Sequence, residues 1–185
     1  MILGIPAFTW LTGQFLLAAR PGPLIKAMGS KGLQEFHGLM AVVAWIAVFF
    51  HRLAAQKTLV NDHTLQARLG TISWLLLALL IFMAVLFMAP GPSKWGPVKA
   101  FRLWSSRVIG FNYQKAKLFH SLNLLLVALV VVHMVLAKTS SWSGNPLGLS
   151  WLLLWTGFCV GTYTLKRFKE ISERRKGSKN TPSPQ

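Results

Sequence analysis

The chain has 185 residues, of which 53% are hydrophobic and only 13% charged, about half the charged fraction of a typical soluble domain. The charge is one-sided, with 20 Lys and Arg against 4 Asp and Glu. In a soluble protein this excess would suggest a nucleic-acid partner, but these cations flank long apolar runs. We therefore expect membrane lipid rather than nucleic acid as the partner of the cations. One cysteine, Cys159, excludes a disulfide within the chain and is expected simply to pack.

Five long stretches with few or no charges follow one another along the chain, and about 20 apolar residues are enough to cross a bilayer. The expected helices lie near residues 2–19, 36–55, 70–89, 118–137 and 148–165. The first stretch has a rival interpretation as a signal peptide, but Arg20 follows it and no basic residue precedes it. A retained helix is favoured. The expected fold is an all-α integral membrane bundle over residues 1–165, followed by a basic tail over 166–185.

The distribution of cations predicts how the helices are oriented. Five crossings place 16 of the 20 Lys and Arg residues on one side, in the 20–35 loop, the 90–117 loop and the tail. Because the positive side is normally cytoplasmic, we expect the N-terminus outside and the tail in the cytoplasm. The last residues, RRKGSKNTPSPQ, are typical of a disordered segment.

The 90–117 loop mixes aromatic residues with its cations. The aromatic residues are Trp95, Phe101, Trp104, Phe111 and Tyr113. Such a mixture suits an amphipathic helix lying at the membrane interface. A loop with aromatic headgroup anchors is an equally good interpretation.

Four of the five histidines lie in the second and fourth expected helices. His37 and His51 are fourteen residues apart, which corresponds to roughly 21 Å of helix rise and a return to within about 40° of the same face. His120 and His133 are thirteen apart, a rise of about 20 Å, but an ideal helix would leave them about 140° out of register. A tightened turn, or a frayed helix start at His120, is therefore needed to bring them onto one face.

The second and fourth helices cross in the same direction, so His37 should meet His120 on the inner side, and His51 should meet His133 on the outer side. A lone histidine in a membrane helix is often only a hydrogen-bond partner. Two matched pairs instead favour the axial ligands of two haem irons. No CxxCH motif is present, so the haems would be non-covalent b-type groups. His63 is expected to be a solvated loop residue.

Other functional motifs are absent from the sequence. There is no GxGxxG motif, no Walker loop and no closely spaced His/Cys cluster for zinc. We therefore predict no catalytic residue, and no site for NAD(P)H or FAD on this chain.

Three segments carry a resemblance to a known family: LLAARPGPLIKAMG, FHGLMAVVAWIAVFFHR and KLFHSLNLLLVALVVVHMVLA. Over roughly residues 10–165 they resemble the transmembrane domain of ferric reductases and NADPH oxidases. That family has a basic segment before its first histidine helix, and histidine pairs spaced by fourteen and then by thirteen. The resemblance implies that His37 and His120 hold an inner haem, and that His51 and His133 hold an outer haem.

The chain departs from that family in three ways. Five expected helices replace the usual six, and the flavin and nucleotide domains carried by many members do not follow. Oxygen-reducing members tend to have a further histidine where this chain has Ala55, which argues against superoxide production.

The expected function is that of an oxidoreductase membrane subunit, a multi-pass di-haem cytochrome of the plasma or inner membrane. Electrons would pass from a separate cytosolic flavoprotein to an external acceptor. Ala44, midway between His37 and His51, is expected to leave room between the haems, and Trp45 beside it is expected to pack. Two rival functions stay open: a quinol-linked cytochrome b subunit, and a non-redox structural subunit with incidental histidines.

Overall fold

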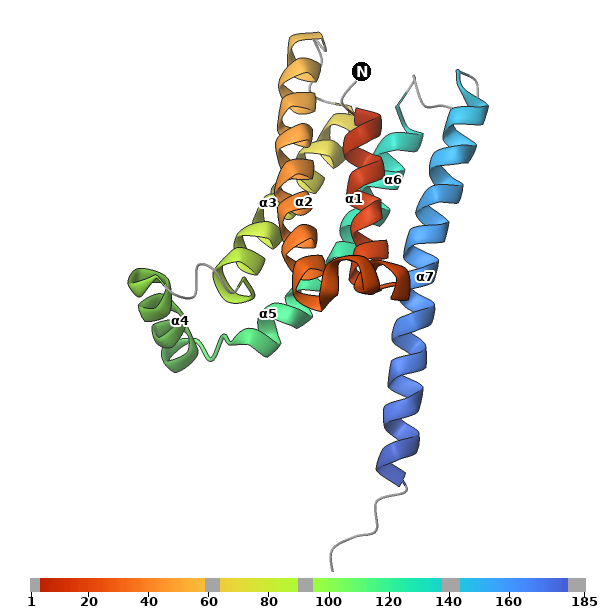
Figure 1. Cartoon of the computed structure of the whole chain (residues 1–185). Coiled ribbons are helices and arrows are strands. Elements are labelled where there is room, and N and C mark those ends of the chain that lie inside the picture. Colours follow the sequence, from red (N-terminus) through yellow and green to blue (C-terminus); the bar gives the residue numbers. More distant parts are fainter. Residues whose placement is uncertain (1–3, 59–63, 90–94, 138–143, 180–185) are drawn as a thin grey trace, which may run out of the picture.

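The computed structural model describes residues 4–58, 64–89, 95–137 and 144–179, and every regular element within these ranges is a helix (Figure 1). The helices are α1 Gly4–Ala18, α2 Gly22–Thr58, α3 Leu65–Phe87, α4 Gly96–Val108, α5 Tyr113–His120, α6 Asn123–Val135 and α7 Pro146–Lys179. The predicted all-α fold is confirmed for these residues.

Three helical segments of the described chain are long and apolar enough to cross a membrane. They are Gly22–Ala55 in α2, Leu65–Phe87 in α3, and Tyr113–Val135, which runs through α5 and α6. These segments contain the second expected helix and all but the last two residues of the third and the fourth. The first and last expected helices correspond to α1 and to the first part of α7, and their role as membrane spans stays a prediction.

Helix α2 begins fourteen residues earlier than the sequence indicated. Its first turns run crosswise below α1, and the chain then bends upward at Gly29 (Figure 1). Gly29 has φ 70° and ψ 164°, a backbone conformation that glycine adopts without the clash of a Cβ atom. The basic segment ahead of His37 is therefore a short helix leading into the long one, rather than a loop.

Helix α7 extends to Lys179, so the disorder predicted for RRKGSK at 174–179 is wrong, while 180–185 lie outside the described residues. Figure 1 shows the C-terminal half of α7 extending beyond the other helices. Residues 166–179 contain mostly Lys, Arg, Glu and Ser, without proline, and Lys, Arg and Glu are good helix formers. Arg167 and Glu170, one turn apart, form an exposed ion pair at 3.5 Å.

Helix α4 favours the amphipathic interpretation of the 90–117 segment. Phe101, Trp104 and Val108, at helical spacing on one face, remain 42%, 51% and 67% exposed. On another face, Arg102 donates from Nε to the Leu86 carbonyl, and from a terminal nitrogen to the Ala89 carbonyl at 3.1 Å. These carbonyls lie at the C-terminal end of α3, where helix geometry leaves acceptors unpaired. Arg102 therefore attaches α4 to the end of a candidate span.

The interior is a stack of apolar contacts between the helices. One cluster, called the apolar layer below, joins α1, α2, α3 and α6; its buried members are Leu11, Leu77, Leu80 and Leu126, with Trp45 and Val48 packed against them. Ala44 is fully buried, and Trp45 packs as expected. Cys159 is buried beside Phe15 where α7 meets α1, so its predicted packing role is confirmed.

Candidate metal and cofactor site

The inner pair, His37 and His120, brings two imidazoles together from α2 and the end of α5. Their ring centroids are 6.4 Å apart and their planes are inclined at 84°. Both side chains are half-buried. His37 Nδ1 is buried without a hydrogen-bond partner, and an unsatisfied buried nitrogen of this kind carries a desolvation cost. The structure therefore juxtaposes the inner histidines that the sequence paired.

The chain between α5 and α6 contains a tightened turn, one of the two features that the thirteen-residue spacing was expected to need. The Ser121 N–H donates to Leu118 O at 3.0 Å, the Leu122 N–H to Phe119 O at 3.0 Å, and the Leu124 N–H to Ser121 O at 3.1 Å. Bonds to the third preceding residue are those of a 3₁₀ turn, which adds about 20° of rotation per residue over an α-helix. The turn follows His120 directly, and over its three bonds it supplies about 60° of the roughly 140° that an ideal helix leaves between His120 and His133.

Asn123, the first residue of α6, holds the end of α5 in place. Its Nδ2 donates to the His120 backbone carbonyl at 2.8 Å and lies 3.2 Å from His120 Nδ1. A polar side chain beside an imidazole restricts the orientation of the ring. Asn123 thus steadies His120 next to the turn.

The outer pair, His51 and His133, lies at the other ends of the same helical segments. His133 Nδ1 lies 2.8 Å from the backbone carbonyl of Gln66 in α3. A carbonyl oxygen only accepts, so Nδ1 donates and the lone pair of the neutral ring is on Nε2. Each outer ring also lies against a glycine: a Cβ on Gly4 would be 3.0 Å from His51, and one on Gly70 would be 2.8 Å from His133.

The apolar layer lies between the two pairs. Ala44 is midway between His37 and His51, and the fully buried Leu126 is about midway between His120 and His133. With a rise of 1.5 Å per residue, the two pairs are separated by roughly 20 Å along the helices. The candidate site therefore consists of two histidine pairs separated by apolar side chains.

This arrangement fits a haem better than a bare metal ion. No group of three or more His, Cys, Asp or Glu in the described ranges could hold a metal ion. A haem supplies four ring nitrogens itself and asks the protein for two axial ligands, which imidazoles can provide. Metal–imidazole bonds of about 2 Å on both sides place coaxial ring centres roughly 6 Å apart. The inner ring centroids lie 6.4 Å apart, close to that distance.

Sequence reasoning missed the groups that surround the outer pair. Gly4, Gly70 and the Gln66 carbonyl were not singled out, although an isolated glycine within an apolar helix often marks a close approach. Arg52, next to His51, donates from its guanidinium to Thr71 Oγ1 at 2.9 Å and lies 5.1 Å from the centre of the Trp74 ring. His63 lies outside the described residues.

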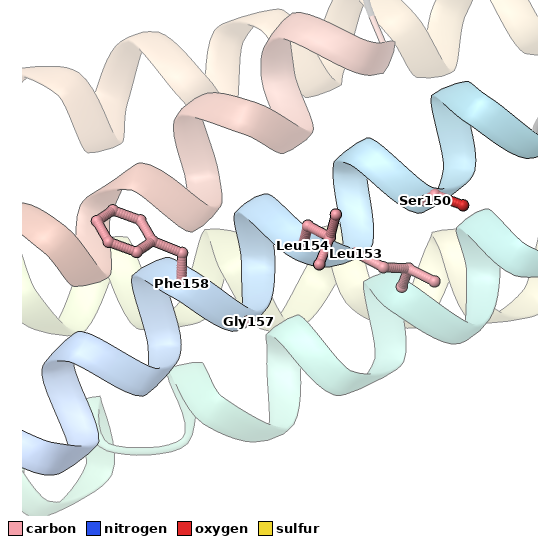
Figure 2. A pocket seen from close by; sticks show the side chains of 5 residues that line it. All are labelled: Ser150, Leu153, Leu154, Gly157 and Phe158. Carbon is pink, nitrogen blue, oxygen red and sulfur yellow. The ribbon is translucent and has the colours of Figure 1, made fainter.

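Figure 2 shows a hollow on the surface of α7. It is lined by Ser150, Leu153, Leu154, Gly157 and Phe158, all from this one helix. Ser150 is its only polar side chain and no histidine reaches it, so this hollow offers no ligand for a metal or a haem.

The chain matches no protein-family model, and no curated protein and no solved structure is significantly similar to it. The resemblance to the ferric reductase family therefore stays a prediction that depends on the histidine spacing and the sequence segments around it.

Proposed function

We propose that this protein is a five-helix membrane cytochrome of the ferric reductase-like class that conducts electrons through two b-type haems. The observation that carries the proposal is the inner pair at 6.4 Å, repeated by a second histidine pair at the far ends of the same two helical segments. An isolated structural histidine would not require a matched partner at both ends.

In this proposal His37 and His120 hold the inner haem, and His51 and His133 hold the outer haem. A bound haem supplies reversible one-electron chemistry, and the protein supplies position and surroundings. Asn123 and the Gln66 carbonyl orient His120 and His133, respectively. The apolar layer keeps water out of the space between the two levels.

The cations of the 95–120 segment suggest the side from which electrons arrive. Lys99, Arg107, Lys115 and Lys117 are exposed, and the segment contains no Asp or Glu. With the 20–35 segment and the tail they make up the positive side, which would be cytoplasmic. A cytosolic flavoprotein with an acidic face could dock there, and salt should weaken that attraction. A topology reporter fused after Gln185 should report the cytoplasm; an external location would reverse the direction of electron flow.

The way in which electrons would leave the outer haem follows from the number of its axial ligands. Two histidines at each iron leave no open position for a substrate, so electrons would leave through contact at the outer surface with an external acceptor. The protein would then act as a conduit, and its reducing substrate would bind only to the partner flavoprotein.

The decisive test is an absorption spectrum of the purified protein, expressed with haem supplied, in its oxidised and reduced forms. We expect a low-spin b-type spectrum, and a pyridine haemochrome assay should give two haems per chain. NAD(P)H alone should not reduce them without a flavoprotein. A colourless, folded protein would rule out the proposal.

A second candidate, a non-redox structural subunit, is favoured by one specific observation. The His133 to Gln66 hydrogen bond joins α6 to α3 without any cofactor, and such bonds stabilise helix pairs in membranes by about 1 kcal/mol. In that case His133→Ala would lower the thermal stability of a protein that never binds haem.

A further inference from the structure

Helix α3 has no side chain at Gly70, and the ring of His133 packs against the helix at that position. A Cβ atom built on Gly70 would be 2.8 Å from His133 Cε1, 3.1 Å from Nδ1 and 3.5 Å from Nε2. Side-chain carbons do not approach other atoms as closely as 2.8 Å. Alanine, or any larger residue, would therefore push the ring away from α3.

The hydrogen bond of His133 explains why this approach matters. A Cβ in a helix points back toward the N-terminus and covers the preceding turn. At position 70, that turn contains the carbonyl of Gln66, four residues earlier. This carbonyl can accept a second hydrogen bond because its oxygen has two lone pairs. The absent side chain at Gly70 exposes the oxygen to which His133 Nδ1 donates at 2.8 Å.

We propose that Gly70 is a positioning residue for the outer haem. By exposing the Gln66 carbonyl, Gly70 lets His133 keep its proton on Nδ1 and direct the lone pair of Nε2 to the iron. Ligating histidines commonly donate their second nitrogen to a carbonyl, which sets the tautomer and the ring orientation. The inference rests on the proposed function, because it assigns a role within that haem site.

The inner pair provides an internal reference, since none of the glycines in the described part of the chain lies against it in this way. A Cβ on Gly38, next to His37, would meet nothing within 4 Å. A substitution at Gly70 should therefore affect the outer haem alone. A general loss of packing would disturb both haems together.

The test compares Gly70→Ala with two controls in the full-length, haem-loaded protein. Gly161→Ala changes a helical glycine whose added Cβ would meet nothing within 4 Å. Gly157→Ala, on the same helix as Gly161, is a second control of this kind, because its added Cβ would also meet nothing within 4 Å. We expect Gly70→Ala to lose the outer haem, so that the content falls from two to one per chain. If the haem is retained, its low-spin electron paramagnetic resonance signal and midpoint potential should change. Both controls should match the wild type.

The outcomes separate this inference from the proposed function. If the wild type binds two haems, and Gly70→Ala keeps the same haem content, signals and potentials, the inference is wrong and the conduit stands. A wild type without haem would overturn both. Should Gly70→Ala fail to accumulate, nitrogen-15 spectra of histidine-labelled, reduced wild type decide the matter, with His133→Ala used for assignment. A proton on His133 Nδ1 supports the inference, and an unprotonated Nδ1 overturns it.

Discussion

The two histidine pairs are built in different ways. The inner pair faces across its own two helical segments: His37 stands free of hydrogen bonds at Nδ1, and His120 is steadied by the adjacent turn and by Asn123. The outer pair is in contact with two other helices: His51 lies against Gly4 of α1, and His133 lies against Gly70 and Gln66 of α3. The inner geometry is therefore set mostly by neighbours in sequence, and the outer geometry by helices distant in sequence.

This difference predicts which substitutions should disturb each histidine pair. Changes to the turn between α5 and α6 should affect the inner histidine directly, since His120 is the last residue before it. Changes on α1 or α3, which contribute no ligand, should affect only the outer pair. A single b-type signal that responds equally to both kinds of change would contradict this distinction.

The largest expected effect comes from removing a ligand. His37→Ala and His120→Ala should each remove the inner haem, and His51→Ala and His133→Ala the outer one, because a single remaining imidazole leaves one axial position empty. A pyridine haemochrome assay should show one haem per chain instead of two. His63→Ala serves as the matched control and should keep both. Full haem content in all four single variants would refute the ligand assignment.

A change of register in the turn should come next. Inserting one alanine between Ser121 and Leu122 rotates everything after it by about 100° relative to His120. His120 and His133 could then no longer face their partners at the same time, so we expect one haem to be lost by the same assay. An alanine inserted after Ser140, in the connection between α6 and α7, is the control. Two fully retained haems in the Ser121 insertion would show that the turn does not set the register.

A milder effect is expected from Asn123→Leu, which keeps the ligands but removes the polar contact with His120. Loss of a group that orients a ligand typically weakens metal affinity about 10–100-fold. Titration of haem-depleted protein should show that loss at the inner site alone. The outer haem of the same sample is the reference, and an equal loss at both sites would indicate general damage to the fold.

The last prediction is that a treatment, the addition of carbon monoxide, has no effect on the haem spectrum. Carbon monoxide should leave the reduced spectrum of the wild type unchanged at both haems, because both axial positions are occupied. Any haem that His51→Ala retains at the outer site would have an open position, and its spectrum should shift. A shift in the wild-type spectrum would reveal direct access to the iron at one of the pairs.

Hydropathy was sufficient to predict the helical segments around the site. The cores of α2, α3 and α6 follow from long uncharged runs, and the helix near 2–19 appears as α1. The need for a tightened turn or a frayed helix start at His120 followed from the numbers 120 and 133 alone, since an ideal helix could not place both histidines on one face. Spacing along a regular helix is a strictly geometric signal.

The remaining features depend on contacts that have no signature in sequence. The end of α7 was placed near 165 because charge begins there, yet a charged segment rich in Lys, Arg and Glu continues the helix to Lys179. The His133 to Gln66 bond joins residues 67 positions apart and uses a backbone carbonyl, a group that every residue has. Only the packing of α3 against α6 brings these two groups together.

The apolar layer has an electrical consequence for the proposed conduit. Its side chains, from Leu11 to Leu126, include no acid or base, so none of them can carry a proton between the inner and outer levels. An electron passing from one level to the other would travel without a compensating proton, and each turnover would separate charge across the membrane. A full crossing couples to the membrane voltage by about 2.3 kcal/mol per 100 mV. The membrane potential of the cell would then help to drive electrons outward, because the inside of the membrane is negative.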